Sequence, residues 1–135
     1  MFSFLVEDVN DFSSKEAMES NGWVFNLDGD HVFVRGGKFC RNVLSTSYCG
    51  FVHPQDLTLS YTFSYSGTAN LQYGQSWDKG SVHVKKNNEE IDSRSSRGSS
   101  NTTFAFSLGD VLHIIELGAS VINIHKLSLQ KSCEK

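Results

Sequence analysis

The segment from Asn70 to Leu129 contains four or five short runs that read as strands, and it ends in two apolar runs, VLHII and SVINIHKLSL. The pattern is clearest just upstream, in LTLSYTFSY, where every second position from Leu57 to Tyr65 is apolar or aromatic. Alternation with a period of two is typical of β-strands that bury one face and expose the other. About nine or ten short strands with frequent turn signals predict an all-β fold, a two-sheet antiparallel jelly-roll sandwich.

The size and charge of the chain narrow its class further. Its 135 residues suit one core, so we predict a single β-sandwich domain over residues 1–135. A net charge of −3 argues against nucleic acid as the partner. No apolar run is long enough to predict membrane insertion.

The start, MFSFLV, lacks the basic region of a signal peptide. We therefore expect a cytoplasmic protein if the chain is complete, and an extracellular or surface-exposed one if it is an excised domain.

One short N-terminal helix interrupts the strand pattern. Ser13 and Glu16 have the spacing of a capping box in front of the good helix formers in KEAMES. Asn21-Gly22 then provides a left-handed stop. The sequence therefore predicts a helix of at most about two turns that covers the sandwich without forming a layer.

Three further local patterns predict details of the strands. Asn87-Asn88 between GSVHVKK and EEIDS predicts a two-residue hairpin turn. The serine-rich stretch from Ser93 to Thr103 is typical of an exposed, mobile polar loop. In the last strand, Ile122 and Ile124 share one face, whereas Leu127 and Leu129 have the opposite phase. This change of phase predicts a β-bulge near His125-Lys126.

Two long runs carry a resemblance to known sandwich domains. YGQSWDKGSVHVKKNNEEIDS and FAFSLGDVLHIIELGASVINIHKLSL resemble the C-terminal half of concanavalin A-like and laminin-G-like domains, in which a G-x-V-x-V hairpin precedes a GD-x-L-x-I strand. The N-terminal VEDVNDF…NGW is similar to the opening of MAM and related jelly-roll domains. Because these patterns consist of strand and turn residues, they specify fold better than function. The resemblance implies a glycan-binding or adhesive module.

The best candidate binding site is the segment NLQYGQSWD, residues 70–78. Sugars present apolar C–H faces and arrays of hydroxyls, so a site for them needs an aromatic platform beside amides and carboxylates. The segment supplies these types in Asn70, Tyr73, Gln75, Trp77 and Asp78. The alternative is that Tyr73 and Trp77 cap the core while the polar residues solvate a turn.

The sequence indicates a metal site less clearly than it indicates a glycan site. Asp28 and Asp30 flank Gly29, and two carboxylates so spaced can share a calcium ion if Glu7 or Asp8 adds a third oxygen. The same DGD also suits a hairpin turn. The five histidines form no H-x-H or HExxH motif. His83, His113 and His125 fall on three different expected strands, so their meeting in space is left open.

The sequence offers no complete catalytic motif. Glu90-Ile91-Asp92 resembles the E-x-D start of the catalytic strand of jelly-roll glucanases, but the chain continues with Ser93-Arg94 where those enzymes place a further Glu. A solvated hairpin explains the two carboxylates equally. No G-x-S-x-G motif or phosphate-binding loop is present. We therefore expect a protein that is not an enzyme.

Two covalent features depend on the compartment. Cys40 and Cys49 bracket RNVLSTSY, and a disulfide between them would stabilise the fold by roughly 2–3 kcal/mol. The alternative is that these two and Cys133 are free thiols. Asn101-Thr102-Thr103 is an N-glycosylation sequon, which matters only if the chain is secreted.

Two functions follow as hypotheses. The first is a non-catalytic, lectin-like module that recognises a glycan or glycoprotein through residues 70–78, with Asp28 and Asp30 as candidate calcium ligands. The second is a structural or assembly protein that self-associates, or adheres to another protein, through a sheet face or edge. An exposed Trp77 on a concave surface favours the first, and a broad apolar patch or free strand edge favours the second.

Overall fold

A computed structural model describes most of the chain as two antiparallel sheets with one helix. The residues it describes are 4–8, 14–26, 33–35, 38–43, 46–49, 57–75, 78, 80–117 and 122–132. Side chains are described for residues 14–26, 57–75, 78, 80–117 and 122–132. Within these ranges no helix has the length and apolar character that crossing a bilayer requires.

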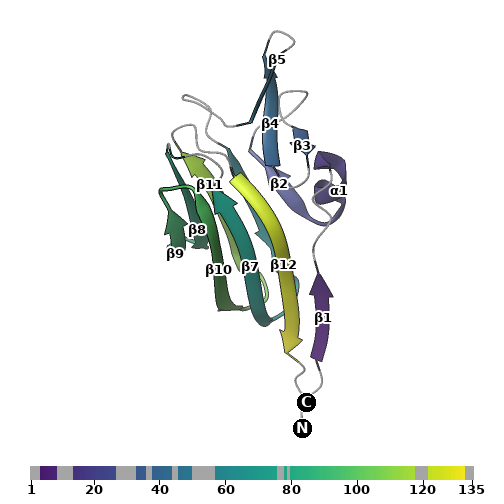
Figure 1. Cartoon of the computed structure of the whole chain (residues 1–135). Coiled ribbons are helices and arrows are strands. Elements are labelled where there is room, and N and C mark those ends of the chain that lie inside the picture. Colours follow the sequence, from purple (N-terminus) through teal and green to yellow (C-terminus); the bar gives the residue numbers. More distant parts are fainter. Residues whose placement is uncertain are drawn as a thin grey trace.

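The first sheet has seven strands. Its main order is β10 (Gly98–Phe106), β7 (Gly67–Gln75), β12 (Ile122–Ser132), β4 (Lys38–Val43) and β3 (Phe33–Arg35). In addition, β1 (Phe4–Asp8) pairs with β12, and β5 (Thr46–Cys49) pairs with β4. Figure 1 shows β1, β12, β7 and β10 side by side, with the β4–β5 hairpin extending beyond one end of them.

The second sheet has five strands and packs against the first. Its order is β2 (Trp23–Phe25), β6 (Thr58–Thr62), β11 (Val111–Leu117), β8 (Ser81–Lys86) and β9 (Glu89–Arg94). The chain crosses between the sheets repeatedly, so that β7 and β8, or β9 and β10, are consecutive in sequence but belong to different sheets. The two-sheet antiparallel sandwich agrees with the expected all-β jelly-roll class.

The core lies between the sheets and follows the predicted alternation. In β6 and its flanks, Leu57, Leu59 and Phe63 are buried, and on β7 Leu71 and Tyr73 are buried. Each large apolar side chain removed from water in this way contributes about 1.5–3 kcal/mol. The core also contains the following residues: Met18, Trp23, Phe25, Ala69, Val82, Val84, Phe106, Leu112, Ile114, Ile122, Ile124, Leu127 and Leu129.

The helix α1 (Lys15–Ser20) forms where KEAMES predicts it, but its cap differs. The N-cap is Ser14, whose Oγ accepts a hydrogen bond from the backbone N of Ala17 at 3.0 Å. The predicted capping box between Ser13 and Glu16 was therefore wrong by one residue. Glu16 instead lies in the first turn, where its charge favours the helix dipole. The stop is confirmed by Gly22, whose φ is 100°.

The β-bulge in β12 is confirmed. The register of β12 against β7 shifts between Ile124 and Lys126, which leaves His125 as the extra residue. Because the extra residue shifts the alternation of buried and exposed positions by one, Leu127 and Leu129 are buried on the same side as Ile122 and Ile124. The predicted hairpin is confirmed as well, because Lys86 pairs with Glu89 and Asn87 adopts a φ of 57°.

The predicted loop from Ser93 to Thr103 was wrong. Strand β9 continues to Arg94 and β10 begins at Gly98, so only three residues connect them. Arg94 organises this turn, because its guanidinium donates hydrogen bonds to the carbonyl oxygens of Ser96, Arg97 and Ser99. The sequence hides the strand because small polar side chains occupy both of its faces until Phe104.

Candidate functional site

The outer face of β10, β7 and β12 carries a cluster of amide and hydroxyl side chains around Asn70. On β7 the core-facing residues alternate with Thr68, Asn70 and Gln72, which point away from the core. Strand register places Thr103 of β10 opposite Asn70 on one side and Ser128 of β12 opposite it on the other. Hydroxyl and amide groups from three adjacent strands therefore lie in one row across the sheet.

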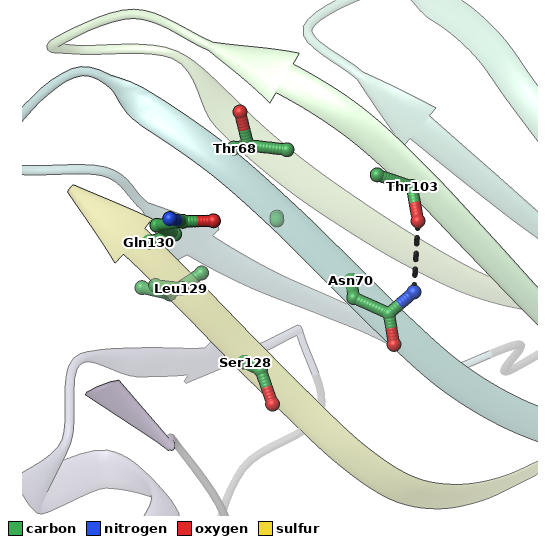
Figure 2. A pocket seen from close by; sticks show the side chains of 7 residues that line it. Thr68, Asn70, Thr103, Ser128, Leu129 and Gln130 are labelled. Atoms are coloured by element: carbon green, nitrogen blue, oxygen red, sulfur yellow. Dashed lines mark hydrogen bonds between the residues drawn. The ribbon is translucent and has the colours of Figure 1, made fainter. Parts of the chain in front are cut away.

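A shallow hollow lies at this row, with a volume of about 180 Å³. Figure 2 shows side chains from three strands around it. Ala69 and Leu129 lie at its floor, since their side chains point into the core. The complete lining is Thr68, Ala69, Asn70, Thr103, Ser128, Leu129 and Gln130.

A hydrogen-bond network fixes the rim of the hollow. Asn70 Nδ2 donates to Asn101 Oδ1 at 2.5 Å and to Thr103 Oγ1 at 2.8 Å, the second of which is dashed in Figure 2. Gln72 Nε2 donates to Asn70 Oδ1 at 3.4 Å. Both amide hydrogens of Asn70 are thus directed at β10, which orients the side chain. The bonds use acceptor atoms of Asn101 and Thr103, and their donor hydrogens stay outside this network.

Tyr73 and Gln75 lie on the opposite side of β7 from Asn70. Tyr73 is 0% exposed, and its hydroxyl donates to Asp92 Oδ2 at 2.9 Å across the sandwich. Burial, and then this hydrogen bond to the carboxylate, raise the pKa of Tyr73 above its ordinary value. Gln75 is 1% exposed, and its Nε2 donates to the carbonyl oxygen of Gly80 at 3.3 Å. The Tyr73 ring therefore joins the two sheets and offers no surface on which a sugar could stack.

Asp78 has a structural contact of its own. Its Oδ1 accepts a hydrogen bond from the backbone N of Arg97 at 2.8 Å, which ties the segment after β7 to the turn between β9 and β10. Trp77 lies outside the described residues, as do Asp28 and Asp30. The five predicted site residues are therefore not gathered on one surface, because Asn70 faces outward while Tyr73 and Gln75 face the core.

The cysteine pair is placed favourably for the predicted disulfide. Cys40 and Cys49 stand directly opposite each other in the antiparallel pairing of β4 and β5. Such positions have Cα atoms about 4.5–5.5 Å apart, a separation that a disulfide can span. The bond itself stays a prediction, since the side chains of β4 and β5 are outside the described set.

His83, His113 and His125 do not come together at one place. On the outer face of the five-stranded sheet, His83 Nε2 lies 2.7 Å from Ser81 Oγ and His83 Nδ1 lies 2.7 Å from Glu90 Oε1. His113 Nδ1 is 2.8 Å from Ser60 Oγ. His125 belongs to the other sheet, at the bulge of β12 beside β7. Among the residues with described side chains, no three His, Cys, Asp or Glu groups gather as a metal site.

The two carboxylates of the E-x-D run point in opposite directions. A register shift between β8 and β9 inserts Ile91 as an extra residue, so Glu90 pairs with Lys85 and Asp92 pairs with Val84. Glu90 is consequently exposed and bonded to His83, whereas Asp92 reaches Tyr73. A glycosidase needs two carboxylates on either side of one bond, and this pair does not provide that arrangement. The solvated hairpin accounts for the exposed Glu90, whereas Asp92 has a structural role as the partner of Tyr73.

Most of the hollow was missed in the sequence. Thr68, Thr103, Ser128 and Gln130 come from three strands, and only the register brings them together. The sequence did contain one signal that could have corrected the predicted site. In a strand with a period of two, Asn70 cannot share a face with Tyr73 and Gln75.

The chain is similar to several solved structures. No protein-family model matches it, and no curated protein matches it. A point mutant of a family 29 carbohydrate-binding module is 14% identical, with 95% of this chain and 92% of that chain covered and a TM-score of 0.56. Two further mutants, made to probe ligand recognition by family 29 modules, are 15% and 16% identical, with TM-scores of 0.56 and 0.54. They cover 95% and 94% of this chain, and 86% and 91% of their own chains. At these identities the similarity shows the fold, and it confirms the fold-level resemblance to jelly-roll β-sandwich domains.

Proposed function

We propose that the protein is a non-catalytic glycan-binding module that holds its ligand on the outer face of β10, β7 and β12. The observation that carries the proposal is the hollow at Asn70, where amides and hydroxyls from three strands surround a floor at Ala69 and Leu129. The similar solved structures are themselves named carbohydrate-binding modules, which supports the same class of ligand.

The chemistry of this surface suits a neutral sugar. Sugar hydroxyls both donate and accept hydrogen bonds, and Asn101 and Thr103 offer donor hydrogens on the same face as the amide groups of Gln72 and Gln130. Each such bond contributes only about 0.5–1.5 kcal/mol net, so several must form together. Rigid strands reduce the entropy lost when these groups are ordered around a ligand. We therefore expect a weak but specific site.

The segment after β7 extends the proposed site. Trp77 supplies the aromatic platform in this proposal, and Asp78 contributes the carboxylate. Gln75, the last residue of β7, is five positions after Asn70, which corresponds to about 17 Å along a strand. A ligand that reaches both the hollow and Trp77 is therefore an oligosaccharide. In the same proposal, calcium at Asp28 and Asp30 is an auxiliary element that a chelator would remove.

A glycan-array screen tests the proposal. Wild type, Trp77→Ala and Asn70→Ala would each be screened with calcium and with chelator. We expect wild type to bind a defined set of oligosaccharides, Trp77→Ala to lose that binding, Asn70→Ala to weaken it by about tenfold, and chelator to weaken it. Ser60→Ala, on the outer face of the other sheet, is the matched control and should bind as wild type does. Well-folded wild type that binds no glycan would contradict the proposal.

A free strand edge favours self-association as a second candidate function. In the described part of the chain, β10 pairs only with β7, so its nine residues end the sheet. Unpaired backbone groups along such an edge can add a strand from another molecule. Lys86 Nζ donates to the carbonyl oxygen of Ala105 at 3.1 Å and thereby occupies part of the edge. Light scattering that gives a concentration-dependent mass, reduced by proline at Thr102, would favour this candidate.

A further inference from the structure

The N-glycosylation sequon lies inside the candidate binding surface. Asn101, Thr102 and Thr103 form the central part of β10, and the register places Thr103 opposite Asn70 and Asn101 opposite Gln72. Asn101 is exposed and accepts the hydrogen bond from Asn70, while Thr103 lines the hollow. Two of the three sequon residues therefore belong to the site that we propose for glycans.

The hydrogen-bond network leaves the acceptor nitrogen of the sequon available. Asn101 contributes its carbonyl oxygen, Oδ1, to the bond with Asn70. An N-linked glycan is attached through the other atom, Nδ2, so attachment preserves this bond. With Oδ1 directed at Asn70, the modified amide keeps the orientation that the unmodified side chain has. The first sugar would therefore stand on the outer face, one strand spacing of about 4.8 Å from β7.

We propose that Asn101 is an N-glycan acceptor and that its glycan covers the hollow at Asn70, closing the site to external glycans. The transfer forms a bond between Asn101 Nδ2 and C1 of a sugar and breaks the bond from that carbon to a lipid pyrophosphate. The amide loses one proton and the lipid pyrophosphate leaves. The donor is a lipid-linked oligosaccharide, which a secretory pathway supplies. The closing of the site rests on the proposed function, whereas the attachment does not.

The first measurement is occupancy. The full chain, directed into the secretory pathway of a glycosylating cell by an added signal peptide, is compared by intact mass with the same chain made in bacteria. We expect the secreted protein to carry one glycan, and Asn101→Gln from the same cells to carry none. The sequence contains no other N-x-S/T site, so the comparison assigns the position. Secreted protein without a glycan would overturn the inference.

The second measurement tests whether the glycan covers the outer face around the hollow, and it needs no added ligand. Lys126 of β12 lies opposite Gln72 on the proposed face, and Lys85 of β8 lies on the outer face of the other sheet. Both are half-buried, so they form a matched pair for labelling with a bulky amine-reactive acyl reagent. We expect the glycan to slow labelling of Lys126 at least about threefold and to leave Lys85 unchanged. Equal rates at Lys126 with and without the glycan would overturn the inference.

The third measurement separates this inference from the proposed function. Glycosylated wild type, the same sample trimmed enzymatically to one sugar, and unmodified wild type from bacteria are titrated with an oligosaccharide from the array. We expect at least about tenfold weaker binding in the glycosylated form and partial recovery after trimming. Equal affinity would overturn the occlusion. If unmodified protein binds no glycan, the proposed function fails, and the mass and labelling results still decide the attachment and position of the glycan.

Discussion

The surface around Asn70 and the outer face of the other sheet differ in the kind of polar group they present. The face of β10, β7 and β12 carries amides and hydroxyls that bond to one another around a hollow. The face of β6, β11 and β8 carries imidazoles, each engaged in its own short contact, as in Ser60–His113 and Ser81–His83. It also presents an apolar residue at its margin, Val24, which is 63% exposed.

This difference indicates where recognition of a neutral ligand is feasible. Neutral amides held on strands can exchange water for sugar hydroxyls at little electrostatic cost, whereas ionisable groups lose hydration when they are covered. On the second face, Glu90 is already bonded to His83, so a ligand there would have to displace an existing contact. The comparison therefore favours the first face for the proposed glycan binding, and the following changes test it.

The largest effect on stability is expected from core residues, which lie beneath both outer faces. Leu71 on β7 and Ile114 on β11 are fully buried and lie on the core side of the two sheets. Because truncation leaves a cavity, Leu71→Ala and Ile114→Ala should each lower the free energy of unfolding by about 2–5 kcal/mol. Urea denaturation measures both. If only one of the two were destabilising, the shared core between the faces would be contradicted.

The next largest effect on stability is expected at the Tyr73–Asp92 hydrogen bond, which links the two sheets beneath the face of β10, β7 and β12. Tyr73→Phe removes the hydroxyl that bonds to Asp92 and should lower stability by about 1–3 kcal/mol at neutral pH. The pKa of Tyr73 is raised in the folded state, so above about pH 10 the unfolded chain loses this proton first. Stability should therefore fall as the pH rises above that value.

Unfolding curves from pH 8 to pH 11 measure this slope. Wild type should lose up to about 1.4 kcal/mol per pH unit from Tyr73 above pH 10, and Tyr73→Phe should lack that part of the slope. Tyr61→Phe is a suitable control, because Tyr61 is only partly buried at the edge of the core. Identical slopes in wild type and Tyr73→Phe would contradict the role of this hydroxyl.

The sequence was sufficient where one face of a strand is apolar. The alternation from Leu57 to Phe63, the turn at Asn87-Asn88 and the phase change in β12 each correspond to a feature of the structure. These patterns are local consequences of burial, so they can be recognised without knowing which strands pair. The family-level comparison with sandwich domains likewise described the fold correctly.

The sequence was insufficient where neither face is apolar or where partners are distant. Strand β10 begins with small polar residues on both sides, and so it resembled a loop. The hollow depends on the register of β10 and β12 against β7, which places Thr103 and Ser128 beside Asn70. Composition grouped Asn70 with Tyr73 and Gln75, although the strand period separates them. Their proximity in sequence was therefore misleading about their proximity in space.

A smaller effect on stability, but a clear one on binding, is expected at the rim of the hollow. Asn70→Ala removes the donor that orients Asn101 and Thr103, and should weaken oligosaccharide binding by about tenfold, or 1.4 kcal/mol. Since Asn70 is only partly buried, the unfolding free energy should change by less than about 1 kcal/mol. Isothermal titration with an oligosaccharide from the array measures the first quantity. Binding at wild-type strength would remove Asn70 from the site.

The smallest effect is expected on the second face. Glu90→Gln keeps the shape of the side chain that contacts His83 but removes its charge. Both partners are solvent-accessible, with side chains 25% and 45% exposed, so the change in stability should stay within about 1 kcal/mol. Glycan affinity should equal that of wild type, because Glu90 and Asn70 project from opposite sides of the sandwich. A loss of binding in Glu90→Gln that is not matched in Asn70→Ala would reverse the assignment, since the ligand would then lie against the imidazole face.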